Sequence, residues 1–225
     1  MKLMKILILD DNNIEQTIDR ITTTLKRFGI ELHVDIINPQ NHIFKGENND
    51  IDFLKIQKHI EENHKNKKYD VISCDFSFSS ESLNGYLLIK WIINSAKSKN
   101  YRFKNAKFIC YSGEENKFKD FVLKNDEIFK LIKLNIHAFY KRDNLSEELT
   151  GLLKRISENY SPKSHLVELL NKEPEKKFQY IYPKFEDKKL GEIASEIDRD
   201  THHGIEFQKY MTELTYSHIL ELNKQ

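Results

Sequence analysis

The chain has 225 residues, which suits one large domain or one domain with an appendage, and it can bury a core without disulfides or a structural metal. Its 36 basic and 35 acidic residues give a net charge of +1, which argues against a broad nucleic-acid clamp. Both cysteines, Cys74 and Cys110, lie in apolar runs and are expected to be buried and reduced. No apolar run approaches the roughly 18 residues of a membrane span, and the N-terminal run ends in two aspartates, so we expect a cytoplasmic protein without membrane contact.

Short apolar runs alternate with amphipathic stretches over the first 160 residues. Five runs have the length and branched residues of buried strands: 5–9, 30–37, 71–74, 107–111 and 136–140. Each is followed by a stretch with apolar residues at helical spacing: 14–28, 51–63, 86–96, 118–131 and 145–156. Gly29 is expected to end the first helix, and the fourth is expected to be interrupted near Asn125 and Asp126.

This alternation of strand and helix implies a parallel sheet with helices on both faces. The predicted fold class is therefore α/β, with a doubly wound five-stranded parallel sheet formed by residues 1–159. In such sheets, ligands bind at the carboxyl ends of the strands. The residues there that carry chemistry are Asp10, Asp11, Asp75, Ser112 and Lys141.

Three carboxylates, one hydroxyl and one ammonium are thus expected at the same edge of the sheet. The three aspartates offer hard oxygen ligands that suit Mg²⁺, and without a cation their repulsion raises at least one pKa. Ser112 offers a hydroxyl to a phosphoryl oxygen, and Lys141 offers a point charge. Such a set would stabilise a phosphoryl group in transit to a carboxylate and resident on it.

Five segments of this region, each near a strand end or in the helix that follows, match a known family in order. They are KILILDDN, YDVISCDFSF, NGYLLIKWI, KFICYSGEE and HAFYKRDNLSEEL. Together they resemble the receiver domains of two-component response regulators. Asp10 and Asp11 match the paired acids of that family, Asp75 matches its phosphoacceptor, Ser112 its Thr/Ser, and Lys141 falls at or near its lysine.

The resemblance implies a CheY-like strand order, 2-1-3-4-5, and a phosphoprotein of signal transduction. Asp75 would take its phosphoryl group from a sensor histidine kinase or a phosphotransfer protein. The only enzyme activity implied is self-catalysed phosphotransfer and dephosphorylation. Mg²⁺ would be held by Asp10, Asp11, Asp75 and the backbone carbonyl of Ser77. A homodimer through the face of the fourth helix and fifth strand also fits the family.

The sequence departs from the family pattern in several places, and the second strand-to-helix loop and the fourth helix are among the extended parts. The loop after Asp75 is longer and lacks the usual proline. The lysine register is open, because alignment on RDNLSEEL places Arg142 rather than Lys141 at the basic position. Simpler interpretations also stay open, with the paired acids as a helix cap and with Asp75 and Ser112 as turn residues.

Residues 160–225 are expected to form a mostly helical extension of unknown role. They carry 10 Lys plus Arg against 12 Asp plus Glu, a net charge of −2. Helical spacing covers 166–170, 190–197 and 205–222, and the aromatic stretch 178–185 is expected to be extended. The extension is too acidic for the DNA-binding output of most response regulators. An apolar face over 205–222 can fold back on the receiver, pair with a second copy or dock a partner.

Two functions are therefore open. The first is a phosphorylatable receiver that acts through protein contacts, or as a phosphoryl sink or relay, without binding DNA. The second is an adaptor or oligomerisation module with a receiver fold, idle chemistry and an active tail. A catalytic tail is a third idea, but no nucleophile–base pair can be named in it. A haloacid-dehalogenase-type phosphatase is disfavoured, because the paired aspartates of such enzymes are separated by one residue, whereas Asp10 and Asp11 are adjacent.

Overall fold

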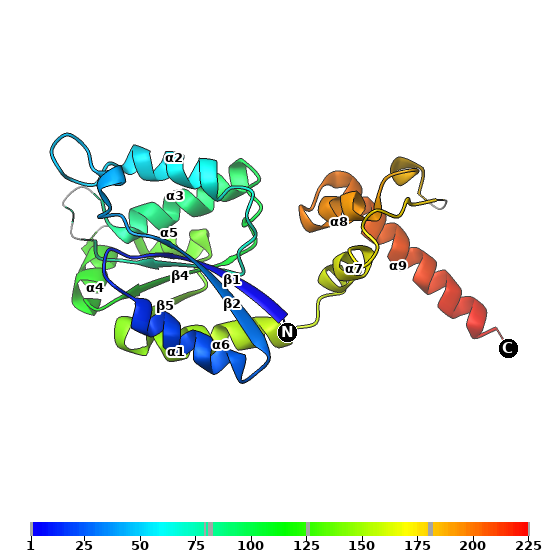
Figure 1. Cartoon of the computed structure of the whole chain (residues 1–225), viewed down its shortest axis with the longest axis horizontal. Coiled ribbons are helices and arrows are strands. Elements are labelled where there is room, and N and C mark those ends of the chain that lie inside the picture. Colours follow the sequence, from blue (N-terminus) through cyan, green and yellow to red (C-terminus); the bar gives the residue numbers. More distant parts are fainter. Residues whose placement is uncertain (1, 79, 81–82, 125–126, 180–181, 225) are drawn as a thin grey trace. The chain divides into compact units, whose positions relative to one another are not determined.

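The computed structural model describes residues 2–78, 80, 83–124, 127–179 and 182–224 (Figure 1). The chain divides into two compact units, one ending at Glu158 and the other beginning at Asn159. Among the described residues, none of the helices combines the length and the apolar character that a bilayer crossing requires.

The first unit is built on one parallel sheet. Its strands are β1 (Lys2–Leu9), β2 (Ile30–Ile37), β3 (Val71–Asp75), β4 (Lys107–Ser112) and β5 (Ala138–Lys141). All neighbouring pairs are parallel, and the order is β2-β1-β3-β4-β5. This is the doubly wound order of flavodoxin and CheY. The predicted fold class and strand order are confirmed.

Helices cover both faces of the sheet (Figure 1). They are α1 (Glu15–Lys26), α2 (Phe53–Asn63), α3 (Gly85–Ser98), α4 (Glu115–Lys124), α5 (Glu127–Leu134) and α6 (Leu145–Glu158). The helix predicted over 118–131, with an interruption, is formed by two separate helices, α4 and α5. The expected interruption at Asn125 and Asp126 lies outside the described residues.

The central strand β1 carries a continuous apolar run because both of its faces are buried there. In β1, Ile6 and Ile8 enter the core shared with α1 and α6, whereas Leu7 and Leu9 enter the core shared with α2 and α3. All four side chains are at most 1% exposed. The continuous apolar run that predicted a buried strand therefore results from two separate cores on one strand.

Gly85 brings the start of α3 directly against the end of β3. Its backbone nitrogen donates to the Phe76 carbonyl at 2.8 Å. A Cβ at this position would lie 1.6 Å from the backbone oxygen of Asp75, so only glycine allows the approach. The Asn84 side chain caps the helix by accepting from Leu87 N at 2.9 Å. The sequence thus fixes where the loop after Asp75 ends.

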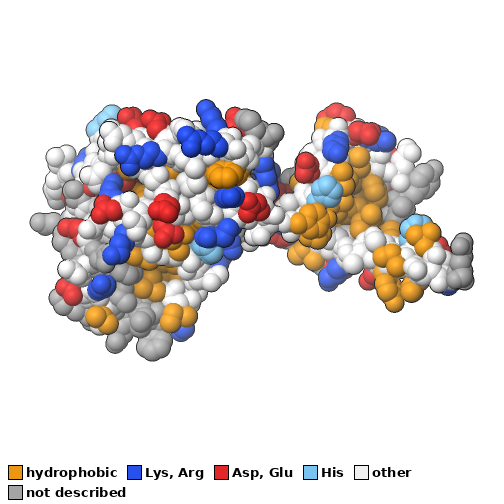
Figure 2. All heavy atoms as spheres, turned by 90° about the horizontal axis from the view of Figure 1, so that it is seen from below, with side chains coloured by type: hydrophobic (Ala, Val, Ile, Leu, Met, Phe, Trp, Pro, Cys, Tyr) orange, Lys and Arg blue, Asp and Glu red, His pale blue; other side chains and the backbone are white. Residues whose placement is uncertain are grey.

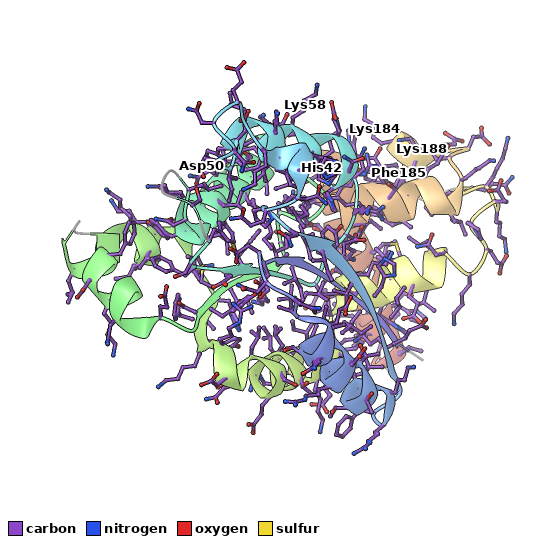
Figure 3. The ribbon with its side chains drawn as sticks, turned by 60° about the vertical axis from the view of Figure 1, so that its left-hand side comes forward. His42, Asp50, Lys58, Lys184, Phe185 and Lys188 are labelled. Carbon is purple, nitrogen blue, oxygen red and sulfur yellow. The ribbon has the colours of Figure 1, made fainter. Side chains whose placement is uncertain are left out.

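The second unit is mainly helical, as predicted. It contains α7 (Pro162–Leu170), a 3₁₀ turn η3 (Pro183–Phe185), α8 (Leu190–Asp198) and α9 (His202–Leu222). Its core is formed by Phe185, Ile193, Ile197 and Phe207. The Lys188 ammonium lies 5.1 Å from the centre of the Phe185 ring, and both residues are labelled in Figure 3. The stretch 178–185, expected to be extended, ends in η3, and residues 180–181 lie outside the described residues.

A three-residue turn, 199–201, joins α8 to α9 in a helix-turn-helix arrangement. Gly204 makes the close crossing possible, because a Cβ there would lie 2.3 Å from the Glu196 carbonyl oxygen. Beyond its first turns α9 is largely exposed, and Figure 2 shows apolar side chains gathered on the surface of this unit. The exposed large apolar residues of α9 are Ile205, Tyr216, Ile219, Leu220 and Leu222.

Candidate functional site

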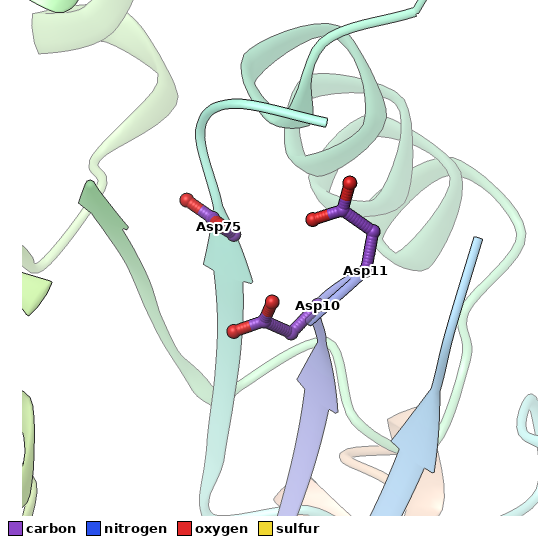
Figure 4. A group of neighbouring side chains, drawn as sticks. All are labelled: Asp10, Asp11 and Asp75. Atoms are coloured by element: carbon purple, nitrogen blue, oxygen red, sulfur yellow. The ribbon is translucent and has the colours of Figure 1, made fainter. Parts of the chain in front are cut away.

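Three aspartates meet at the carboxyl ends of β1 and β3 (Figure 4). Asp10 and Asp11 directly follow β1, and Asp75 is the last residue of β3. One carboxylate oxygen of each lies within 4.8 Å of the others. Asp10 is 0% and Asp75 2% exposed, whereas Asp11 is partly exposed. The structure therefore brings together the acids that the strand ends predicted.

Asp10 is held by hydrogen bonds to both of its carboxylate oxygens. Oδ1 accepts from the backbone nitrogen of Asn12 at 2.8 Å. Oδ2 accepts from the Tyr111 hydroxyl at 2.5 Å and from Nη2 of Arg142 at 2.7 Å. A buried carboxylate needs such partners, because an unpaired buried charge is very costly.

Arg142 donates hydrogen bonds to the acids at the ends of two strands, Asp10 after β1 and Asp75 of β3. It begins the 3₁₀ turn η2 (Arg142–Asn144) after β5, and its Nη1 donates to Oδ2 of Asp75 at 2.6 Å. The guanidinium carbon lies 5.7 Å from the centre of the Tyr111 ring. Lys141 pairs in register with Ser112 at the end of β5, and its side chain is exposed. The basic side chain paired with the buried acids is therefore that of Arg142.

The protonation of Asp75 reflects these surroundings. Burial and the negative charge of Asp10 raise the pKa of Asp75 to about 6, against the opposing effect of Arg142. Burial and the charge of Asp10 also raise the pKa of the Tyr111 hydroxyl well above its ordinary value. Tyr111 is thus a fixed hydrogen-bond donor at any physiological pH.

A cleft of about 310 Å³ opens onto Asp75. Its lining consists of Asn12, Asp75, Ser77, Phe78, Gly113, Glu114 and Arg142. The Ser77 nitrogen donates to Oδ1 of Asp75 at 3.3 Å. Ser112 is buried beside the cleft, where its Oγ accepts from the Glu114 nitrogen at 2.9 Å. The cleft is open enough for a small charged group to reach the Asp75 carboxylate.

The donor set suits a hard divalent cation. Three carboxylates at one point are the ligands that Mg²⁺ prefers, and the partly exposed Asp11 leaves room for the waters that Mg²⁺ retains. The residues present therefore fit the metal that the sequence predicted. Asp10, Asp11 and Asp75 would hold it, and the ion would supply positive charge to a phosphoryl oxygen.

Sequence reasoning missed two members of this site and left a third open. The sequence pattern places Tyr111 only within a strand and assigns no role to Asn12. The choice between Lys141 and Arg142 was open because a one-residue shift in register decides which side chain turns inward. The one available signal for Tyr111 was its place directly before Ser112, at the carboxyl end of a central strand.

No family model and no curated protein matches the chain. Similar solved structures include a sensor protein from Polaromonas sp. JS666, with 12% identity over 68% of this chain and 94% of that one and a TM-score of 0.40. A response regulator receiver protein from Pseudomonas putida has 15% identity over 68% and 98%, with a TM-score of 0.38.

A third similar structure is RcsB from Salmonella enterica serovar Typhimurium, bound to promoter rprA. It has 15% identity over 93% of this chain and 98% of that one, with a TM-score of 0.36. All three TM-scores lie below 0.5, so the fold class rests on the strand order of this chain itself. The first unit has a doubly wound five-stranded parallel sheet, the fold class that the sequence predicted. A mainly helical unit follows it, as the helical spacing of residues 160–225 predicted.

Proposed function

We propose that this chain is a two-component receiver that accepts a phosphoryl group on Asp75 from a histidine kinase or phosphotransfer protein, with Mg²⁺ bound by the three aspartates. The observation that carries the proposal is the position of Asp75. It is a buried carboxylate at the end of a central strand, it faces an open cleft, and two further acids and a guanidinium surround it.

In this proposal, an oxygen of the Asp75 carboxylate attacks the phosphorus of a phosphohistidine. The phosphorus–oxygen bond forms as the phosphorus–nitrogen bond breaks, and the electron pair returns to the imidazole nitrogen, which takes up a proton. The product is an acyl phosphate on Asp75. Because the pKa of Asp75 is about 6, most of the carboxyl is ionised above pH 7, as a nucleophile must be.

In this proposal, Arg142 and Ser112 then donate hydrogen bonds to the phosphoryl oxygens. Arg142 already lies 2.6 Å from Asp75 and offers a planar fork of donors to phosphoryl oxygens. The Ser112 hydroxyl, one residue beyond the strand register of Asp75, offers a further donor. We assign the basic role to Arg142, and we place Lys141 at the exposed rim of the same sheet edge.

For output, we propose protein contacts, or service as a phosphoryl sink or relay, rather than DNA binding. A short turn joins α8 to α9, but the outward side chains of these helices carry both signs of charge. The polar residues along α9 include His202, His203, Glu206, Lys209 and Glu213. The exposed apolar residues of α9 instead favour a protein partner, with a second copy as one candidate.

Intact mass after incubation with Mg²⁺ and acetyl phosphate tests the phosphoryl hypothesis. We expect one phosphate adduct on the wild-type chain and none on Asp75→Asn. Asp19→Asn, an exposed aspartate of α1, is the matched control and should be labelled like the wild type. Absence of an adduct on the wild type, together with absence of Mg²⁺ binding, would favour the alternative of an idle receiver-fold adaptor that acts through residues 160–225.

A further inference from the structure

Tyr111 and Arg142 bind the same oxygen of Asp10. The Tyr111 hydroxyl donates to Oδ2 at 2.5 Å, and Arg142 Nη2 donates to it at 2.7 Å. The other arm of the guanidinium holds Oδ2 of Asp75. Every carboxylate oxygen of these two acids therefore accepts a hydrogen bond within the protein, since Oδ1 of Asp10 is bound by Asn12 and Oδ1 of Asp75 by Ser77.

This arrangement differs from a bare acidic cluster that requires a metal. The guanidinium supplies a fixed positive charge between two buried carboxylates, and the Tyr111 ring lies 5.7 Å from the guanidinium carbon. The contact with the ring and the two hydrogen bonds fix where the guanidinium lies. The acids are thus neutralised and oriented by the chain's own side chains.

We propose that Tyr111 and Arg142 form an internal counter-ion clamp that holds Asp10 and Asp75 in place of a divalent cation and that Mg²⁺ must displace from Asp10. The inference rests on the proposed function of the acidic cluster as a Mg²⁺ site. Tyr111 is a positioning residue in this scheme, because it acts on the metal through Asp10. The clamp keeps the site folded without metal, and it weakens Mg²⁺ binding by competing for the same oxygen.

The physical argument is competition for lone pairs and for charge. A carboxylate that already accepts two hydrogen bonds on one oxygen must give up at least part of them to coordinate a cation there. A cation placed beside the guanidinium also meets like charge. Removal of either member should therefore strengthen Mg²⁺ binding, whereas simple damage to a buried site would weaken it.

Calorimetric titration of the full-length chain with Mg²⁺ tests the clamp. We expect Tyr111→Phe to tighten Mg²⁺ binding about tenfold, equivalent to about 1.4 kcal/mol, because one hydrogen bond to a charged group is lost. Arg142→Gln should tighten it further, and Arg142→Lys should lie between that variant and the wild type. In EDTA, Tyr111→Phe and Arg142→Gln should both have a lower melting temperature than the wild type. Added Mg²⁺ should raise the melting temperature of each variant more than it raises that of the wild type.

Tyr69→Phe is the matched control. Tyr69 is also a buried tyrosine whose hydroxyl donates to a carboxylate, that of Asp35, away from the acidic cluster. The Tyr69→Phe substitution should lower the melting temperature and leave the Mg²⁺ affinity unchanged. Unchanged or weaker Mg²⁺ binding in Tyr111→Phe would overturn the clamp.

The failure of the clamp is distinguishable from the failure of the proposed function. If the wild type is phosphorylated on Asp75 while Tyr111→Phe leaves Mg²⁺ affinity unchanged, only the clamp is wrong. If Mg²⁺ binds neither the wild type nor any of these variants, the clamp is wrong, because its removal should expose a competent site. If the wild type binds Mg²⁺ and the variants bind it more tightly but Asp75 is never labelled, the clamp stands and the phosphoryl hypothesis fails.

Discussion

His64 shows how burial changes the chemistry of a single residue outside the acidic cluster. It is 5% exposed at the end of α2, and its Nδ1 lies 2.6 Å from the Tyr69 hydroxyl, which donates to Asp35. Burial, with the nearby charge of Lys67, lowers the pKa of His64 to about 4, against the opposing charge of Asp35. The histidine is therefore neutral in the folded protein at pH 7.

The lowered pKa of His64 predicts a loss of stability in acid. In the unfolded chain, His64 is protonated below its ordinary pKa of 6.5. In the folded chain, it is protonated only below about pH 4. The free energy of unfolding should therefore fall as pH drops from 6.5 to 4. We expect His64 to contribute about 1–2 kcal/mol of this fall, allowing for partial solvent screening.

Urea unfolding of His64→Gln between pH 7 and pH 4.5 measures that contribution. The slope of stability against pH should be shallower than in the wild type. His42→Gln replaces an exposed histidine of the same unit, labelled in Figure 3, and should keep the wild-type slope. An unchanged slope in His64→Gln would show that the proton uptake lies elsewhere.

At the scale of the element, the junction between β3 and α3 determines how the site is presented. The loop after Asp75 can be long because Gly85 brings the chain back against the strand end. Gly151, in α6, has no atom within 4 Å of the position of a Cβ. These two helical glycines of the same unit differ in what a Cβ would meet.

We predict opposite effects of alanine at these two glycines. Gly85→Ala places a Cβ on the Asp75 carbonyl and should destabilise the chain by about 3 kcal/mol, because backbone must move to relieve the clash. Gly151→Ala should stabilise it by about 0.5–1 kcal/mol through lower entropy of the unfolded chain. Denaturant unfolding of both variants checks the pair. Equal stability of Gly85→Ala and the wild type would mean that α3 does not need this close contact.

At the scale of the whole molecule, separate hydrophobic cores divide the chain into two units. The first unit has a core on each face of its sheet, and the second has a small core around Phe185 and Phe207. We propose that this division is a domain boundary, near the predicted boundary between residues 159 and 160. The charges are also divided, since residues 160–225 carry a net charge of −2 within a chain of net charge +1.

This distribution of charge predicts weak or absent binding to DNA, although a short turn joins α8 to α9 as in a helix-turn-helix. Phosphate contacts from Lys and Arg supply most non-specific affinity, and α9 has Glu206 and Glu213 on either side of Lys209. In fluorescence anisotropy with a short duplex at 50 mM salt, the full-length chain should show no saturable binding. Tight binding that weakens steeply with added salt would instead assign a DNA-binding output to the second unit.

The order of elements, the parallel sheet and the meeting of the acids could all be predicted from the sequence. These follow from local patterns, because continuous apolar runs form central strands and residues after parallel strands share one edge. Asp10, Asp11 and Asp75 could be predicted together for that reason. The mostly helical nature of residues 160–225 could be predicted from helical spacing alone.

Which basic residue faces the acids, and which side chains hold Asp10, depends on the tertiary structure. Lys141 and Arg142 are neighbours, and the turn at the end of β5 directs Arg142 to the acids and leaves Lys141 exposed. Tyr111 and Asp10 are 101 residues apart, and their contact exists only because β4 and β1 lie on either side of β3. Contacts across strands depend on register and on packing of the whole sheet, and a local sequence pattern does not contain either.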